Sequence, residues 1–345
     1  MQPIIIAGPC SAESEEQLYC TAQQLYDHLL LSSHKLSYFR TGIWKPRSRP
    51  KEFQGAGKAA LPWLNKINRD FGFPICVEVA SPEHLHDCLE AGIKTVWIGS
   101  RTAVNPFVVQ ELADTVKGEE ITVLVKNPIV PDLKLWIGNI ERFLNASVKE
   151  VIAIHRGFSE KNERVYRYHP MWDIPIELKV HYPDIPIICD PSHISGNKKH
   201  IAQISQIALD YGFNGLMIET HYRPKEALSD ARQQITPIEL THLLAHLSFK
   251  STLTSPAENE LRKQRNLIEN IDTQISELLH QRMNVVDIIA QIKIKNNLPV
   301  VQPKQWNKVV QTYTDQTEND IKYKDFIQKY LELLHQSSIE RQRND

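Results

Sequence analysis

The stretch Ile185-Pro186-Ile187-Ile188-Cys189-Asp190-Pro191-Ser192-His193 joins a short apolar run to an ending rich in reactive side chains. Seven more short apolar runs between residues 1 and 221 lead into glycine, charged or polar residues in the same way. These runs are Ile4–Ala7, Ser37–Phe39, Ile75–Val77, Thr95–Ile98, Ile121–Val125, Val151–Ile154 and Leu216–Ile218. Runs of this length, bounded by polar residues, are typical of buried strands.

The segments between these runs have the spacing of helices, with apolar residues every three or four positions. They are Glu15–Leu31, Pro82–Ala91, Pro106–Val116, Trp136–Asn145 and Lys199–Tyr211, with Thr236–Leu247 as the last. Alternation of strand and helix predicts an α/β fold of parallel βαβ units. Eight such units favour a closed (β/α)8 TIM barrel over the rival doubly wound open sheet. A barrel would gather the polar strand endings at one mouth.

The pattern changes after residue 248. We predict a barrel domain over residues 1–248, a linker over 249–256 and a separate all-α, three-helix domain over 257–345. The first helix would run from 257 to 297, and shorter ones would cover about 303–315 and 321–343. Its apolar stripe is Ile268, Ile271, Ile275, Leu278, Val285, Ile289 and Ile292. Two short helices cannot cover this stripe, so a homodimer or higher homo-oligomer is expected through the helical domain.

Composition narrows the function classes. The 345 residues are 41% hydrophobic and 23% charged, with a formal net charge of −1, so no general affinity for nucleic acid is expected. Five irregularly spaced cysteines indicate a reducing compartment rather than a disulfide framework. The first apolar run is too short for a signal peptide, and no run approaches the ~20 residues of a membrane span. We therefore expect a cytoplasmic protein without membrane partners.

Four residues that follow predicted strands have side chains suited to a metal ion. They are Cys10, His193, Glu219 and Asp230. Taken singly, each is ordinary, since a lone cysteine is more often a small buried hydrophobe. A barrel would bring them together, and one thiolate, one imidazole and two carboxylates suit a divalent transition ion such as Mn²⁺, Fe²⁺, Co²⁺ or Zn²⁺.

A second group of strand endings is cationic. It comprises Arg40, Lys45, Arg47, Arg101, Lys126 and Arg156. Convergent cations repel one another unless anionic partners are present. Phosphate and carboxylate groups meet that need, and arginine binds them in a bidentate manner. The mouth of the barrel is therefore predicted to bind two small anionic substrates beside a metal. We further expect the cationic neighbours of Lys45 to lower its pKa and suit it to proton transfer.

The ordered motifs resemble those of type I 3-deoxy-D-arabino-heptulosonate 7-phosphate (DAHP) synthases across residues 1 to about 247. The motifs are Gly8-Pro9-Cys10-Ser11, Lys45-Pro46-Arg47-Ser48, Ile98-Gly99-Ser100-Arg101, His155-Arg156-Gly157, Asp190-Pro191-Ser192-His193 and Glu219-Thr220-His221…Ser229-Asp230. The resemblance implies condensation of phosphoenolpyruvate with erythrose 4-phosphate, the entry step of the shikimate pathway and hence of aromatic amino acid biosynthesis. By this similarity the metal ligands are Cys10, His193, Glu219 and Asp230.

The same resemblance implies roles for the cations. Phosphoenolpyruvate would be held by Arg40, Lys45, Arg101, Lys126 and Arg156. Erythrose 4-phosphate would be held by Arg47 and Ser48. Mn²⁺ is the expected cofactor, acting as a Lewis acid on the aldehyde of erythrose 4-phosphate. Lys45 is the candidate catalytic residue.

The long helix has its own polar pattern. Arg282 falls within the apolar stripe, and Lys293 lies 11 residues on, about 16 Å along the helix axis. Arg265 precedes Arg282 by 17 residues, about 25 Å, too far to share one small ligand within a chain. An antiparallel partner helix would supply Arg265 from the other protomer. From the residues alone, a dimerising coiled coil that tolerates polar residues explains the pattern equally well.

The order of residues across about 257–343 also resembles the all-α (AroQ-class) chorismate mutases. The resemblance implies that chorismate is bound by Arg265 of the partner and by Arg282, Lys293, Ser338 and Gln342. Lys293 and Gln342 would stabilise the ether oxygen as its bond breaks, since this rearrangement to prephenate needs no nucleophile. Relatives often carry Asp, Arg and Glu at the start of the second helix, where this chain has Gln302, Gln305 and Trp306.

Four functions remain open from the sequence. The first is a bifunctional transferase and isomerase with synthase and mutase activities. The second keeps the synthase but makes the helical domain a dimerising module that senses chorismate or prephenate. The third is the sister condensation with arabinose 5-phosphate, against which Lys45-Pro46-Arg47-Ser48 and the fused helices argue. The fourth, a phosphate-binding barrel without activity, is disfavoured by the full set of metal ligands.

Overall fold

The computed structural model describes residues 2–30, 32, 34–47, 51–161, 163, 165–249, 255–315 and 321–343. The chain divides into two compact units, Met1–Ser251 and Thr252–Asp345.

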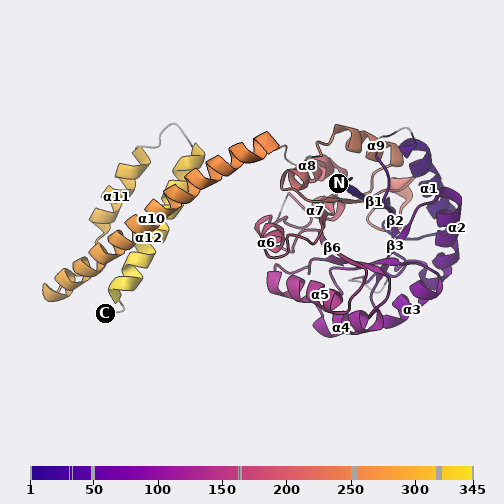
Figure 1. Cartoon of the computed structure of the whole chain (residues 1–345), viewed down its shortest axis with the longest axis horizontal. Helices are drawn as coiled ribbons and strands as arrows, with labels where there is room; N and C mark the ends of the chain where they lie inside the picture. Colours follow the sequence, from indigo (N-terminus) through magenta and orange to yellow (C-terminus); the bar gives the residue numbers. More distant parts are fainter. Residues whose placement is uncertain are drawn as a thin grey trace. The chain divides into compact units, whose positions relative to one another are not determined.

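In the described part of the first unit, eight parallel strands close into a barrel in chain order, β1 to β8 (Figure 1). Each strand pairs with the next, and β1 pairs with β8, for example Ile5 opposite Leu216. The strands are β1 (Ile4–Gly8), β2 (Tyr38–Thr41), β3 (Ile75–Val79), β4 (Thr95–Ile98), β5 (Thr122–Lys126), β6 (Glu150–His155), β7 (Ile187–Cys189) and β8 (Gly215–Glu219). The predicted (β/α)8 barrel is confirmed, and the open sheet is excluded.

Helices surround the barrel (Figure 1). They are α1 (Glu15–Leu29), α2 (Leu61–Phe71), α3 (Pro82–Glu90), α4 (Pro106–Thr115), α5 (Leu133–Asn145), α6 (Asp173–His181), α7 (Pro191–Ser195), α8 (Ile201–Asp210) and α9 (Pro237–His246). Several begin at a side-chain cap, such as Ser14 before α1, Asp132 before α5 and the Thr236–Glu239 capping box of α9. Helices α2, α6 and α7 are additions to the segments expected from the sequence.

Alternate strand residues face opposite sides and build two cores. Inside the barrel, side chains from most strands form one small apolar cluster: Ile6, Cys76, Trp97, Leu124, Ile152, Ile154, Ile188 and Met217. The outward residues, such as Phe39 and Val123, join the larger core beneath the helices. The filled interior makes the barrel a rigid support with no pore, so chemistry is confined to its mouth.

The second unit consists of α10 (Ser255–Lys295), α11 (Pro303–Asp315) and α12 (Ile321–Arg343). Val286 and Ala290 on α10 and Leu331 on α12 are buried. The seven residues of the predicted stripe all remain exposed in the single chain, from 40% at Ile289 to 62% at Leu278. The predicted all-helical domain is confirmed. Among the described residues, no helix combines the length and apolar character that a membrane crossing requires.

Candidate active site

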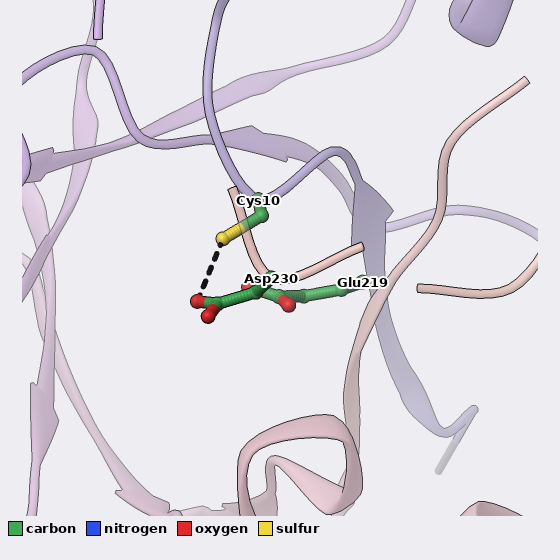
Figure 2. A group of neighbouring side chains, drawn as sticks. All are labelled: Cys10, Glu219 and Asp230. Atoms are coloured by element: carbon green, nitrogen blue, oxygen red, sulfur yellow. Dashed lines mark hydrogen bonds between the residues drawn. The ribbon is translucent and has the colours of Figure 1, made fainter. Parts of the chain in front are cut away.

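Three predicted metal ligands meet at the mouth of the barrel. Cys10 follows β1, Glu219 ends β8 and Asp230 lies in the loop after β8; one donor atom from each lies within 4.8 Å of the others. Figure 2 shows the Cys10 sulfur directed toward the Asp230 carboxylate, and Sγ donates to Oδ2 at 3.3 Å. Cys10 and Glu219 are fully buried. Their donor atoms come together because the barrel closes by pairing β8 with β1.

The fourth predicted ligand, His193, adjoins this group from α7. Its Nε2 lies 3.6 Å from Glu219 Oε1, and its Nδ1 lies 2.8 Å from Asp190 Oδ2. Asp190 also caps α7, since its Oδ1 accepts from the His193 backbone N–H at 3.0 Å. A carboxylate on one ring nitrogen orients the other nitrogen toward a metal, an arrangement common in metalloenzymes. Burial lowers the pKa of His193 to about 4, despite Asp190, so the imidazole is neutral.

The charges of this cluster suit a cation. Burial alone would raise the pKa of Glu219, but His193 and Arg40 outweigh it and hold the pKa below its usual value. Burial likewise opposes ionisation of Asp230, yet Lys45 and His193 hold its pKa well below the usual range. Burial raises the pKa of Cys10, and the nearby Glu219 adds to that effect. Two anionic carboxylates, a neutral imidazole and a thiol fit a divalent transition metal, which would also stabilise the thiolate.

Lys45 lies beside this cluster. Its Nζ donates to Cys10 Sγ at 2.7 Å and to the Cys10 carbonyl oxygen at 3.1 Å. Burial would lower the pKa of Lys45, but Cys10, Glu219 and other acidic groups raise it above the ordinary value. The expectation of a lowered pKa is therefore wrong, because the nearest groups are acids rather than the neighbouring cations. Lys45 is an ammonium at neutral pH.

The predicted cations line one cavity of about 150 Å³ next to the metal cluster. Its lining includes Arg40, Lys45, Arg47, Arg101, Lys126 and Arg156, together with His193 and Asp230. Trp97 lies beneath them: Arg40 Cζ is 4.8 Å and Lys126 Nζ is 5.7 Å from its ring centroid. Arg40 is 1% exposed, and within the described residues its Nε and Nη1 have no hydrogen-bond partner. Buried unpaired donors of this kind fit an anionic ligand.

Individual cations are held by acidic or aromatic neighbours. Lys126 Nζ donates to Asp190 Oδ2 at 2.7 Å, and Arg156 Cζ lies 3.5 Å from the Tyr168 ring centroid. Arg47 lies 3.4 Å from Glu52 and 4.0 Å from Asp230, atom to atom. Ser48, the other predicted contact for erythrose 4-phosphate, lies outside the described residues.

Glu78 of β3 lines the same cavity, and its carboxylate requires glycine at position 99. A Cβ added at Gly99 would lie 2.1 Å from Glu78 Oε1. Only glycine leaves room for this carboxylate. The Gly99-Ser100-Arg101 motif therefore admits Glu78 to the cavity as well as supplying Arg101.

A polar cluster in the second unit joins α10 to α12. Arg282 Nη1 donates to Ser338 Oγ at 2.8 Å, and Lys293 Nζ donates to Gln342 Oε1 at 3.0 Å. Lys293 Nζ also donates to the Val300 carbonyl oxygen at 2.6 Å. The four residues predicted to bind chorismate from one chain thus form two paired contacts. Arg265, the fifth, lies exposed on the same helix, α10.

The start of α11 differs chemically from the pattern of acidic and basic residues in related mutases. The Trp306 ring stacks on His335 of α12, with centroids 4.0 Å apart and planes at 13°. Trp306 also lines a cavity of about 600 Å³ that includes Arg282. An aromatic pair, and not the acidic and basic residues that relatives often carry, therefore lies at the start of α11.

Residues 1–253 match the family model described as the DAHP synthetase I family. The chain belongs to this family. Its members are generally metal-dependent, in agreement with the donor cluster at the barrel mouth. Residues 264–343 match the model for chorismate mutase type II. The chain therefore joins a DAHP synthetase I barrel to a chorismate mutase type II helical domain.

Two relatives illustrate the similarity. A phospho-2-dehydro-3-deoxyheptonate aldolase of Thermotoga maritima is 29% identical over 231 residues, which are 67% of this chain and 64% of the relative. The chain thus spans less than two thirds of that relative's length. A 2-dehydro-3-deoxyphosphooctonate aldolase of Wolinella succinogenes is 24% identical over 271 residues, which are 71% of this chain and 97% of the relative.

Solved structures agree with the fold. The crystal structure of a DAHP synthase from Thermotoga maritima has a TM-score of 0.62 and 26% identity, covering 71% of this chain and 68% of that one. A truncated 3-deoxy-D-arabino-heptulosonate 7-phosphate synthase from the same organism has a TM-score of 0.60 at 24% identity, covering 71% and 84%.

The strand endings predicted only part of this candidate site. Arg167 lines the cavity but lies 11 residues beyond Arg156, in the loop between β6 and α6. Asp190 was part of a motif, yet its contacts with His193 and Lys126 were not anticipated. The sequence around Arg167 gives no sign of its role, because its partners Asp230 and Gln233 lie in another loop.

Proposed function

We propose that the barrel condenses phosphoenolpyruvate with erythrose 4-phosphate and water to give DAHP and phosphate. One observation carries this proposal: the cations expected to hold phosphoenolpyruvate line a single cavity beside the four candidate metal ligands. Two phosphorylated substrates supply the anionic groups that such a cavity needs. Arg40 and Arg156, both buried, suit bidentate binding of phosphate or carboxylate.

Cys10, His193, Glu219 and Asp230 would hold the metal in this proposal. When bound, the metal supplies Lewis-acid polarisation of the aldehyde of erythrose 4-phosphate. Mn²⁺ is the ion we favour, and Fe²⁺, Co²⁺ and Zn²⁺ suit the same ligands. Asp190 holds the His193 ring in the ligand tautomer through its contact with Nδ1.

The reaction then depends on orientation and charge. The cations fix phosphoenolpyruvate so that its C3 attacks the aldehyde carbon, and they hold the two anions face to face. Positive character develops at C2, water adds there, and phosphate leaves by C–O cleavage. Lys45 carries a proton at neutral pH, as an ordinary lysine does, and its raised pKa makes it a weaker acid than usual. Its proposed role is to donate that proton to the new alkoxide, which is a stronger base than the lysine amine. Arg47 and Ser48 are the proposed contacts for erythrose 4-phosphate.

A substrate comparison tests this proposal. The purified chain is stripped of metal, supplied with Mn²⁺ and phosphoenolpyruvate, and given either erythrose 4-phosphate or arabinose 5-phosphate. We expect release of phosphate and a seven-carbon product, identified by mass, with the first aldehyde. Preference for arabinose 5-phosphate would reassign the barrel to the reaction named for the Wolinella relative. Lack of condensation with either aldehyde, with or without metal, would refute the enzymatic proposal.

We propose a second activity, conversion of chorismate to prephenate, for the helical domain. The paired contacts Arg282–Ser338 and Lys293–Gln342 support it, because they place two cations of α10 against residues four positions apart on α12. Arg282 and Lys293 would bind the carboxylates of chorismate, and Lys293 with Gln342 would stabilise the ether oxygen. Ser338 orients Arg282. Arg265 would come from a partner protomer in a homodimer formed through the exposed stripe of α10.

Chorismate turnover by the full chain separates this activity from the regulatory alternative. The mutase proposal expects prephenate to form at a rate that saturates with chorismate. Saturable binding of chorismate or prephenate without turnover would make the domain a sensor instead. The comparison is informative because Trp306 replaces the carboxylate that related mutases often carry.

Two proposals about organisation accompany these activities. We assign residues 1–248 to the synthase domain, 249–256 to a linker and 257–345 to the mutase domain; the matched families end and begin nearby, at residues 253 and 264. We also place the protein in the cytoplasm, because all five cysteines are free thiols.

A further inference from the structure

Arg167 is held against the turn that ends α7, the helix of His193. Its backbone N–H donates to the Ile194 carbonyl oxygen at 3.0 Å. Gly196 follows at φ +68°, and a Cβ there would lie only 2.4 Å from Arg167 Cβ. Close approach and a left-handed backbone both require glycine at this position. The backbone of Arg167 is thus positioned by the same short segment that carries His193.

The guanidinium of Arg167 contacts two residues of the loop after β8. Its Nη1 donates to Asp230 Oδ1 at 2.9 Å and to Gln233 Oε1 at 2.8 Å. Gln233 then donates from Nε2 to Glu219 Oε2 at 2.7 Å. Gln233 is 1% exposed and Glu219 is fully buried, so the second contact is shielded from water. A continuous chain of hydrogen bonds therefore joins Arg167 to both carboxylates of the donor cluster.

The two oxygens of each carboxylate face different partners. Asp230 uses Oδ1 for Arg167, while Oδ2 accepts from Cys10 Sγ at 3.3 Å. Glu219 uses Oε2 for Gln233, while Oε1 lies 3.6 Å from His193 Nε2 and 3.3 Å from Arg40 Nη2. In both carboxylates, the oxygen not bound by Arg167 or Gln233 is the one directed toward the other donors of the cluster.

We propose that Arg167 and Gln233 are positioning residues that fix the metal-site carboxylates, so that Asp230 presents Oδ2 and Glu219 presents Oε1 to the ion. This inference rests on the proposed metal-dependent function of the site. Residues that hydrogen-bond to metal ligands typically change metal affinity about 10- to 100-fold when they are removed. Arg167 also lines the substrate cavity, so direct binding of a substrate phosphate is the competing role that a test must separate.

Cobalt titration of the metal-free full chain, without substrate, provides that separation. Co²⁺ bound by a thiolate absorbs by charge transfer, and its d–d bands report the ligand arrangement. We compare the wild type with Arg167→Gln, Gln233→Met and the conservative Arg167→Lys. Arg223→Gln is the matched control, because Arg223 is 62% exposed and pairs with Glu226 away from the cavity. Thermal unfolding of each metal-free variant shows whether it is folded.

We expect Arg167→Gln and Gln233→Met to weaken cobalt binding about 10- to 100-fold and to alter the d–d bands. Arg167→Lys should recover part of the affinity, and the double variant should lose less than the sum of the two single effects, because both residues act in one chain. Arg223→Gln should match the wild type.

Wild-type cobalt affinity and spectra in both variants would overturn the positioning role. If such variants also showed a raised KM for a phosphorylated substrate, Arg167 would be a substrate contact. Failure of the wild type itself to give a Cys10-dependent cobalt spectrum would instead reject the proposed metal site, and the positioning role with it.

Discussion

The ammonium nitrogen of Lys45 lies 2.7 Å from the sulfur of Cys10, a contact between the residue proposed to donate a proton and one proposed to bind the metal. Burial raises the pKa of the Cys10 thiol, and Lys45 opposes that effect. In the proposed mechanism the pair links metal binding to acid catalysis, since a thiolate that binds the metal would leave the ammonium beside an anion.

Cys10→Ala tests this link in the full chain. Without the thiolate, we expect synthase activity with saturating Mn²⁺ to fall below about 1% of wild type, because the metal loses an anionic ligand. Prephenate formation should persist, since the helical domain has its own polar cluster. Phosphate release and chorismate consumption measure the two activities. Cys20→Ala, on α1 away from the mouth, serves as the control; normal metal-dependent synthase turnover in Cys10→Ala would refute the assignment.

Stability of the barrel should fall in mild acid because of His155. This residue ends β6, is fully buried and packs against the rings of Trp136, Phe158 and Trp172. Burial lowers its pKa to about 3 from an ordinary value of 6.5. Between these values the unfolded chain binds the extra proton, so the free energy of unfolding decreases as pH falls, by up to about 1.4 kcal/mol per pH unit.

Urea unfolding of the barrel at pH 7.5 and 5.5 measures this effect. His155→Gln should reduce the acid-induced loss by about 1 kcal/mol over that interval, because glutamine does not titrate. Other buried histidines titrate in both proteins, so only the difference between them is informative. His86→Gln, on the exposed face of α3, should behave as wild type. An unchanged pH dependence in His155→Gln would show that this imidazole is not the source.

Mixed dimers test whether the mutase site is shared. Arg265→Ala and Arg282→Ala should each abolish prephenate formation, because each removes one cation from every site. Subunit exchange between the two should restore about a quarter of wild-type activity: half of the dimers are mixed, and each has one intact site of two. Mixing either variant with Lys329→Met, a change on the exposed side of α12, should leave activity at about half of wild type with or without exchange, so only the first mixture should gain activity. Absence of recovery despite proven exchange would mean that Arg265 does not act across protomers.

The exposed stripe of α10 should hold the dimer together. Leu278→Asp places a charge at a side chain that is 62% exposed in the single chain but would be buried between protomers. We expect sedimentation velocity to show monomers at concentrations where the wild type is dimeric, with loss of mutase activity. Leu30→Asp, at a leucine 63% exposed on the barrel unit, is the matched control. A dimeric Leu278→Asp variant would locate the interface elsewhere.

Local patterning accounts for most of the fold. The predicted run Thr95–Ile98 coincides with β4, and the predicted helices 303–315 and 321–343 coincide with α11 and α12. The spacing of apolar residues follows the buried face of each helix or strand, so the elements can be recognised from the sequence. The apolar pattern is less informative at the ends of elements. The run predicted to stop before Arg40 continues as β2 to Thr41.

For the candidate site, the local sequence predicted the residues but not all of their contacts. The strand endings were enough to select Cys10, His193 and the cations, because a closed barrel brings all its strand ends to one mouth. The sign of the Lys45 pKa shift was not accessible, since it depends on through-space distances to Cys10 and Glu219. The partners of Arg167 were equally hidden, because they lie 63 and 66 residues away in the chain. Sequence determined which chemical groups are present and on which elements; tertiary structure decided which of them touch, because electrostatic and hydrogen-bond energies depend on distances that only the closed fold sets.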